Sequence, residues 1–165
     1  MIDTITSFLA SDIRTATPIL IAALGIVFSE RAGIVNIGTE GLMLIGSLVC
    51  VAGSYYTGSV LLGTIIGMII TMLFALVFGY FTITVKADQT VVGTAINIFA
   101  GGFTIALNRV LFGLNTSIPK IDVFDKVKIP VLGDIPIIGE SLFNQSVPVY
   151  LAFLAVPLAW FYIVV

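Results

Sequence analysis

The sequence contains no histidine and a single cysteine, Cys50, among its 165 residues. A zinc site needs several Cys or His ligands, and one cysteine forms no disulfide within the chain. A nucleotide-binding glycine loop with its lysine is also missing, as is the set of Ser, His and Asp residues that a hydrolase uses. These absences exclude the common enzyme sites, and we expect no metal ion, cofactor or catalytic residue in this chain.

Charged residues are scarce as well, with seven Lys and Arg and nine Asp and Glu. They make up 10% of the chain, whereas soluble domains contain about 25%, and 59% of the chain is hydrophobic. This composition excludes a soluble enzyme, a disordered segment and a basic nucleic-acid-binding protein, so we expect no nucleic-acid partner. It predicts an all-α membrane protein, a multi-span helical bundle surrounded by the lipid bilayer.

The longest run without a charge covers residues 41–85. As one helix it would reach about 68 Å, roughly twice the hydrocarbon thickness of a bilayer, so it turns back once. Residues 53–58 contain two glycines and two tyrosines and are the predicted turn. Residues 1–10 extend the first span or lie along the membrane surface. We expect one transmembrane domain over residues 1–165, with spans at about 12–29, 41–55, 59–85, 89–112 and 147–165.

Residues 113–146 have a different composition and contain seven of the sixteen charges. Valine and isoleucine alternate there with turn-forming residues, which predicts short strands. We therefore expect a small extramembrane loop between the last two spans.

Residues 30–41 interrupt the apolar sequence with three glycines and three charges. Non-helical backbone at membrane depth requires surrounding protein or a water-filled cavity, and broken helices of this kind occur in transporter pathways. The alternative is an ordinary solvated loop. Glu40 is either a first-turn acid favoured by the helix dipole or an intramembrane acid with a function.

A polar stripe follows the helix expected from residue 89. Its members are spaced by 4, 3, 4, 3 and 4 residues, which places them on one helical face, and Gln89 flanks them. Asparagine facing lipid is costly, so this face either packs against another helix or lines a pathway in which Asn97 bonds a solute. Asp88 is expected to cap the helix. The stripe consists of Thr90, Thr94, Asn97, Gly101, Thr104 and Asn108.

Small residues recur at every fourth position of the preceding span, which predicts close contact with another helix. We assign this ridge to helix packing, and its three glycines to that role in particular. The ridge consists of Ser59, Gly63, Gly67, Thr71, Ala75 and Gly79.

Three blocks of the sequence resemble, in order, the permease subunits of ATP-binding-cassette (ABC) nucleoside importers. That family is related to the simple-sugar (ribose-type) and branched-chain amino-acid permeases. The blocks are SERAGIVNIGTEG at 29–41, ADQTVVGTAIN at 87–97, and GDIPIIG at 133–139 followed by FNQ at 143–145.

The resemblance implies a multi-pass subunit of the cell (plasma or inner) membrane that translocates nucleosides. Its implied partners are a second permease subunit, a separate ABC ATPase that hydrolyses ATP, and an extracytoplasmic substrate-binding protein. The matching positions make Asn36, Glu40, Gln89 and Asn97 candidate pathway residues, and Thr94 and Asn108 join them from the polar stripe.

Members of that family are about twice as long, so we expect this chain to correspond to an N-terminal half. Two alternatives stay open: a ribose-type sugar permease of the same architecture, and a truncated membrane scaffold without transport activity. The resemblance places residues 113–146 outside and the turn at Lys86 inside. The three lysines of the 113–146 loop favour the opposite orientation by the positive-inside rule, and our prediction follows the resemblance.

Overall fold

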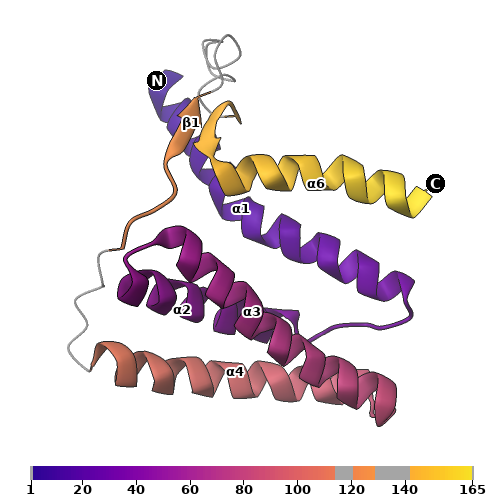
Figure 1. The fold of residues 1–165 in the computed structure, drawn as a ribbon. Helices are drawn as coiled ribbons and strands as arrows, with labels where there is room; N and C mark the ends of the chain where they lie inside the picture. Colours follow the sequence, from indigo (N-terminus) through magenta and orange to yellow (C-terminus); the bar gives the residue numbers. More distant parts are fainter. Residues whose placement is uncertain (1, 114–120, 129–141, 165) are drawn as a thin grey trace. The chain divides into compact units, whose positions relative to one another are not determined.

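The computed structural model describes residues 2–113, 121–128 and 142–164 (Figure 1). The chain forms two compact units, one of residues 28–123 and one of residues 1–27 with 124–165. The elements are α1 (Ile2–Arg31), α2 (Thr39–Thr57), α3 (Val60–Gly79), the π-helical turn η1 (Tyr80–Thr84), α4 (Gln89–Phe112), β1 (Lys126–Lys128), β2 (Asn144–Ser146) and α6 (Val147–Val164).

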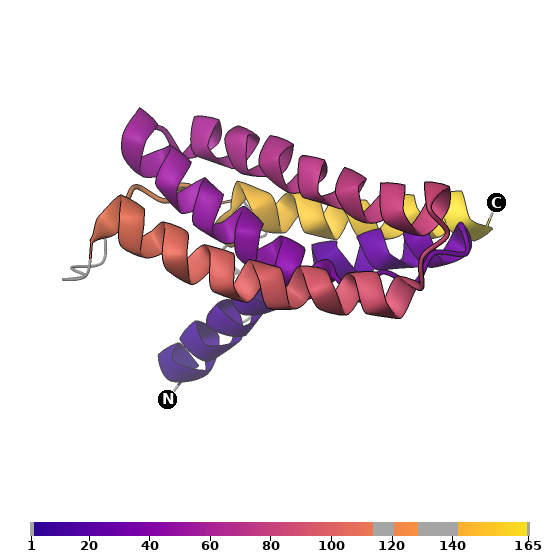
Figure 2. The same cartoon turned by 90° about the horizontal axis from the view of Figure 1, so that it is seen from below.

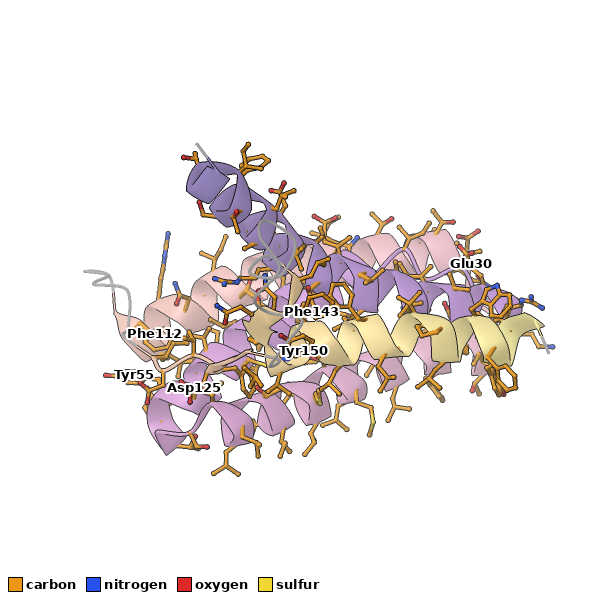
Figure 3. All side chains as sticks on the ribbon, turned by 90° about the horizontal axis from the view of Figure 1, so that it is seen from above. Glu30, Tyr55, Phe112, Asp125, Phe143 and Tyr150 are labelled. Atoms are coloured by element: carbon orange, nitrogen blue, oxygen red, sulfur yellow. The ribbon has the colours of Figure 1, made fainter. Side chains whose placement is uncertain are left out.

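Helix α2 is the central helix of the 28–123 unit and contacts both α3 and α4 (Figures 1 and 2). Its buried apolar side chains are Leu42 and Ile45, of which Ile45 is 0% exposed. At its C-terminal end the ring of Tyr55 meets that of Phe112 edge-on, with centroids 5.5 Å apart (Figure 3). The C-terminal ends of α2 and α4 therefore meet, so the two helices run parallel. Helix α3, which lies between them in the sequence, runs in the opposite direction.

The contact between α2 and α3 depends on small residues, because any side chain larger than hydrogen would enter the neighbouring helix. A Cβ atom at Gly63 would meet Ser54 and lie 2.8 Å from the carbonyl oxygen of Cys50. A Cβ atom at Gly67 would meet the side chain of Cys50. Helix α3 thus presents glycines where the backbones come closest.

Gly79 does not share this role. A Cβ atom there would have no described atom within 4 Å, so the packing contact expected at Gly79 is absent from the part of the chain that is described. Successive i+4 positions rotate by about 40° around a helix, so Gly79, four such steps beyond Gly63, points about 160° away from it.

The turn after α2 is shorter than predicted. Gly53 stays helical because it faces Gly63 across the helix contact, where its Cβ position lies 3.0 Å from the Gly63 Cα. The reversal falls at Gly58, whose φ of 65° is left-handed and suits glycine. The Gly58 N–H donates to the carbonyl of Ser54 at 2.9 Å. Helix α2 therefore continues to Thr57.

The connection from α3 to α4 is tight. After η1, Lys86 adopts a φ of 57°, in the left-handed region that ends helices. The carboxylate of Asp88 then accepts hydrogen bonds from the N–H groups of Thr90 at 2.8 Å and Val91 at 3.1 Å. The predicted N-cap at Asp88 is confirmed.

In the other unit, β1 and β2 pair antiparallel, with Val127 opposite Gln145. The short strands predicted in the 113–146 loop are therefore present, although the 133–139 block lies outside the described residues. Gln145 is 0% exposed. Its side-chain oxygen accepts a hydrogen bond from Nε of Arg14 at 2.8 Å, and its backbone N–H donates to the hydroxyl of Tyr150 at 3.1 Å.

Within the described residues, three helical segments are long and apolar enough to cross a membrane: Thr4–Arg31, Val60–Thr84 and Gln89–Phe112. Few of their residues are buried, and large apolar side chains such as Ile98 (73% exposed) point outward. Soluble monomers rarely expose so much apolar surface, whereas lipid accommodates it. The all-α membrane fold is thus confirmed. Helix α2, which contains Glu40, is not among these three segments, and the apolar stretch Val147–Ile163 is shorter than they are. The five-span arrangement therefore stays a prediction.

The glycine contact predicts different effects on stability for the same substitution at two glycines of α3. Gly63→Ala should destabilise the protein by about 1–3 kcal/mol, because the added Cβ meets the backbone of α2. Gly79→Ala should be neutral or stabilising by up to about 1 kcal/mol, because its Cβ position is open and alanine favours helix. Thermal unfolding in detergent measures both, and equal midpoints for the two variants would contradict the described packing.

Candidate functional site

The glycine-broken segment begins where α1 ends. The Ile34 N–H donates to the Ser29 carbonyl and the Gly33 N–H donates to the Glu30 carbonyl, both at 2.9 Å. With Gly33 at a φ of 79°, these two bonds form a Schellman motif. The motif ends the helix sharply, so the chain continues from residue 34 as irregular backbone until α2 begins at Thr39.

Gln89, the first residue of α4, holds the start of this segment. Its side-chain oxygen accepts a hydrogen bond from the Val35 N–H at 2.6 Å. Its side-chain nitrogen donates to the Gly33 carbonyl at 3.4 Å. One amide side chain thus binds a backbone donor and a backbone acceptor two residues apart.

Asn97, two helical turns further along α4, holds the end of the segment in the same way. Its Nδ2 donates to the Ile37 carbonyl at 3.0 Å, and its Oδ1 accepts from the Gly41 N–H at 2.7 Å. The Gly41 N–H belongs to the first turn of α2, where backbone donors lack intrahelical partners. Since the N-cap residue Gly38 has no side chain to satisfy them, Asn97 caps α2 from another helix.

Between the two amides, the backbones of the segment and α4 are in contact. A Cβ atom at Gly93 would lie 2.8 Å from the Gly38 nitrogen and 3.1 Å from the Ile37 Cβ. A Cβ atom at Gly41 would lie 2.9 Å from both Cα and Oδ1 of Asn97. Glycine is therefore required on both sides of the contact.

Asn36 and Glu40 lie on the segment without joining this contact. The Asn36 carbonyl accepts a hydrogen bond from the Thr39 hydroxyl at 3.0 Å, whereas its side-chain Oδ1 is buried and has no partner among the described residues. Glu40 is exposed in the first turn of α2, the position at which the helix dipole favours an acid.

The remaining polar stripe divides into two parts. Thr94 is exposed and its hydroxyl donates to the Thr90 carbonyl of the same helix at 2.8 Å. The C-terminal part of the stripe lines a groove between α2 and α4. The groove measures about 400 Å³ and is lined by Leu44, Ser47, Leu48, Val51, Thr104, Ile105 and Asn108.

The groove contains polar groups on an otherwise apolar surface. The hydroxyls of Ser47 and Thr104 donate to carbonyls of their own helices, at 2.9 Å and 2.7 Å, and keep free lone pairs as acceptors. The Asn108 amide has no hydrogen bond to any described residue. The volume falls within the range of about 300–1,000 Å³ that small-molecule sites occupy. A small polar molecule would find a donor and several acceptors here.

One polar cluster was missed by sequence reasoning. Gln145 links β2 to α1 through Arg14, and the Tyr150 hydroxyl donates to the Val127 carbonyl at 2.8 Å. Gln145 and Asn97 have similar roles: in each, a side-chain amide forms hydrogen bonds with polar groups from another part of the chain. The position of Gln145 in the FNQ block was a signal, but nothing in the sequence indicated that it is buried.

Comparisons with known proteins identify the family of the chain. Residues 8–164 match the family described as the permease component of the branched-chain amino acid transport system. The chain belongs to this family. It is therefore a membrane-bound permease component, which is not itself catalytic, and the ABC permease relationship inferred from the three sequence blocks is confirmed.

Three relatives are similar over most of the chain. A guanosine ABC transporter permease protein of Bacillus subtilis is 40% identical over 88% of the chain. A nucleoside ABC transporter permease protein of Lactococcus lactis is 32% identical over 98%. A putative glucose ABC transporter permease protein of Haloferax volcanii is 33% identical over 94%.

The chain spans about half the length of these curated relatives: 48%, 53% and 47% in the order given. No solved structure matches the chain.

The contact between the segment and α4 predicts different effects of one substitution at two glycines of α4. Gly93→Ala places a Cβ against the backbone of Gly38, which should destabilise the protein by about 1–3 kcal/mol. At Gly102 the Cβ position is open, so Gly102→Ala should stabilise by up to about 1 kcal/mol. Thermal unfolding in lipid nanodiscs compares them, and a neutral Gly93→Ala would show that the backbones are not in contact.

Proposed function

We propose that the chain is a transmembrane subunit of an ATP-driven ABC importer and that its solute is a nucleoside. Two observations support the solute class. Two of the relatives carry names that specify guanosine or nucleosides, and the groove between α2 and α4 offers hydrogen-bonding groups on an apolar surface. Ribose hydroxyls and the edges of a nucleobase require such groups to replace water.

The proposed assembly contains a second permease subunit, an ABC ATPase and an extracytoplasmic substrate-binding protein. The sequence has no glycine-rich nucleotide-binding loop, so ATP binds and is hydrolysed on the separate subunit. Differential closure of the two permease subunits opens the pathway alternately to each side of the membrane.

The observation that carries the proposed pathway is the Asn108 amide in the groove. It is the polar side chain of the groove that is not committed to a backbone carbonyl of its own helix. A passing solute forms hydrogen bonds with Asn108 and with the hydroxyl oxygens of Ser47 and Thr104. Because transport requires release as well as binding, a few neutral hydrogen bonds suit this role better than charges do.

Asn36, Glu40 and Thr94 remain proposed borders of the pathway. The exposed positions of Glu40 and Thr94 and the unpaired Oδ1 of Asn36 are compatible with this role. Gln89 and Asn97 differ from them, since both amides bind backbone groups of residues 33–41.

A sugar importer of the same architecture is the second candidate, and the similarity to the putative glucose permease favours it. The groove chemistry suits both solutes, because ribose and glucose present the same kind of hydroxyl group. Uptake experiments separate these candidates from a membrane scaffold without transport.

Replacement of Asn108 tests the proposed pathway. Asn108→Leu, made in the intact transporter, should raise the KM for guanosine uptake about fivefold to tenfold, because one hydrogen bond is worth about 1 kcal/mol. Val110→Leu is the matched control, since Val110 is 80% exposed on the same helix and should leave uptake unchanged. Uptake of radiolabelled guanosine, ribose and glucose is measured for each solute separately, and guanosine uptake is also measured in competition with unlabelled guanosine, ribose and glucose.

Three results would count against this proposal. An unchanged KM in Asn108→Leu would remove the groove from the pathway. Stronger competition by ribose or glucose than by unlabelled guanosine would indicate a sugar importer. Absence of uptake of all three solutes by the wild-type protein with its partners would favour the scaffold.

A further inference from the structure

We infer that Gln89 and Asn97 are positioning residues that fasten residues 33–41 to α4, so that α2 and α4 move as one body, and that neither amide contacts the transported solute. We call this set of contacts the amide latch: the side chains of Gln89 and Asn97, the close contact at Gly93, and the backbone of residues 33–41. The inference goes beyond the proposed function and holds whichever solute is carried.

Both amides are already engaged by backbone groups of residues 33–41, each through its oxygen and its nitrogen. Asn97 uses its oxygen for the Gly41 N–H and its nitrogen for the Ile37 carbonyl, at 2.7 and 3.0 Å. Gln89 uses its oxygen for the Val35 N–H at 2.6 Å. A solute that took over these groups would leave backbone donors and acceptors of residues 33–41 without these partners, which is unfavourable wherever water does not replace them.

The latch residues of α4 are evenly spaced along the helix. Gln89, Gly93 and Asn97 follow one another at four-residue intervals and so form one ridge of the helix. Each member meets the segment: Gln89 at residues 33 and 35, Gly93 at residues 37 and 38, and Asn97 at residues 37 and 41. Eight residues of α4 correspond to a rise of about 12 Å, so the segment is held along about 12 Å of the helix.

Helix α2 is bound to α4 at both of its ends. Asn97 caps the first turn of α2, and at the other end the Tyr56 hydroxyl donates to the Leu111 carbonyl at 3.3 Å. The Tyr55 ring meets Phe112 at the same end. Because α2 is bound to α4 at both ends, tilting one helix against the other breaks contacts at both. The pair therefore transmits motion as a single element.

Loss of uptake alone does not separate a latch from a solute contact, so the test combines two measurements on the intact protein. The first is the rate of tryptic cleavage after Arg31, which precedes the latched segment and is cut when that segment opens. The second is uptake kinetics, with KM and maximal rate determined separately. The variants are Asn97→Leu, Gln89→Leu and Gln89→Glu.

We expect Asn97→Leu and Gln89→Leu to raise the cleavage rate after Arg31 about tenfold and to lower the maximal uptake rate, with KM within twofold of wild type. Gln89→Glu keeps the acceptor for the Val35 N–H but loses the donor to the Gly33 carbonyl, so its cleavage rate should lie between those of the wild type and Gln89→Leu. If Asn97→Leu does not accumulate, the Gln89 pair provides the test, because Gln89 lies at the helix end.

Either of two results would overturn the inference: a cleavage rate unchanged in both leucine variants, or a KM for the solute that rises tenfold. The cleavage assay needs no solute. If the wild-type protein imports no nucleoside, the proposed function is wrong, and the proteolysis experiment still tests the latch.

Discussion

The contact between residues 33–41 and α4 is the constraint on which the 28–123 unit depends. The chain leaves α1 at a glycine, runs as irregular backbone, and enters α2 without a side-chain cap of its own. Backbone groups in an apolar environment must find partners inside the protein, and two amides of α4 supply them. Glycines at 38, 41 and 93 allow the approach that these hydrogen bonds require. The broken segment is thus held in a defined conformation by α4.

This constraint explains how one polar stripe serves two purposes. Near the start of α4, Gln89 and Asn97 bind the segment, and the helix is fastened there. Near its end, the stripe turns toward the groove shared with α2, where Thr104 and Asn108 are accessible. Since contacts bind α2 to α4 at both ends, the groove that we propose as the solute pathway has walls that keep their spacing.

Sequence patterns predicted those features that depend on neighbours in the chain. The scarcity of charge predicted the membrane fold, the spacing before residue 89 predicted the Asp88 cap, and alternation predicted the short strands. Periodicity also showed which α4 residues share a face. The segment that covers this face is held by contacts distant in sequence, such as that between Val35 and Gln89, and no local pattern predicts them. Four-residue spacing marked Gly63 and Gly67, which contact α2, whereas the rotation of about 40° per step points Gly79 away from that contact, and its packing role stays a prediction. The burial of Gln145 required the tertiary fold.

The most direct measurement of the central contact is residue-resolved hydrogen–deuterium exchange of the wild-type protein in lipid nanodiscs. The N–H groups of Val35 and Gly41 bind the two amides, whereas those of Ile37 and Glu40 have no partner in the described chain. The account predicts that Val35 and Gly41 exchange about tenfold more slowly than Ile37 and Glu40. Equal exchange rates across the four positions would contradict it.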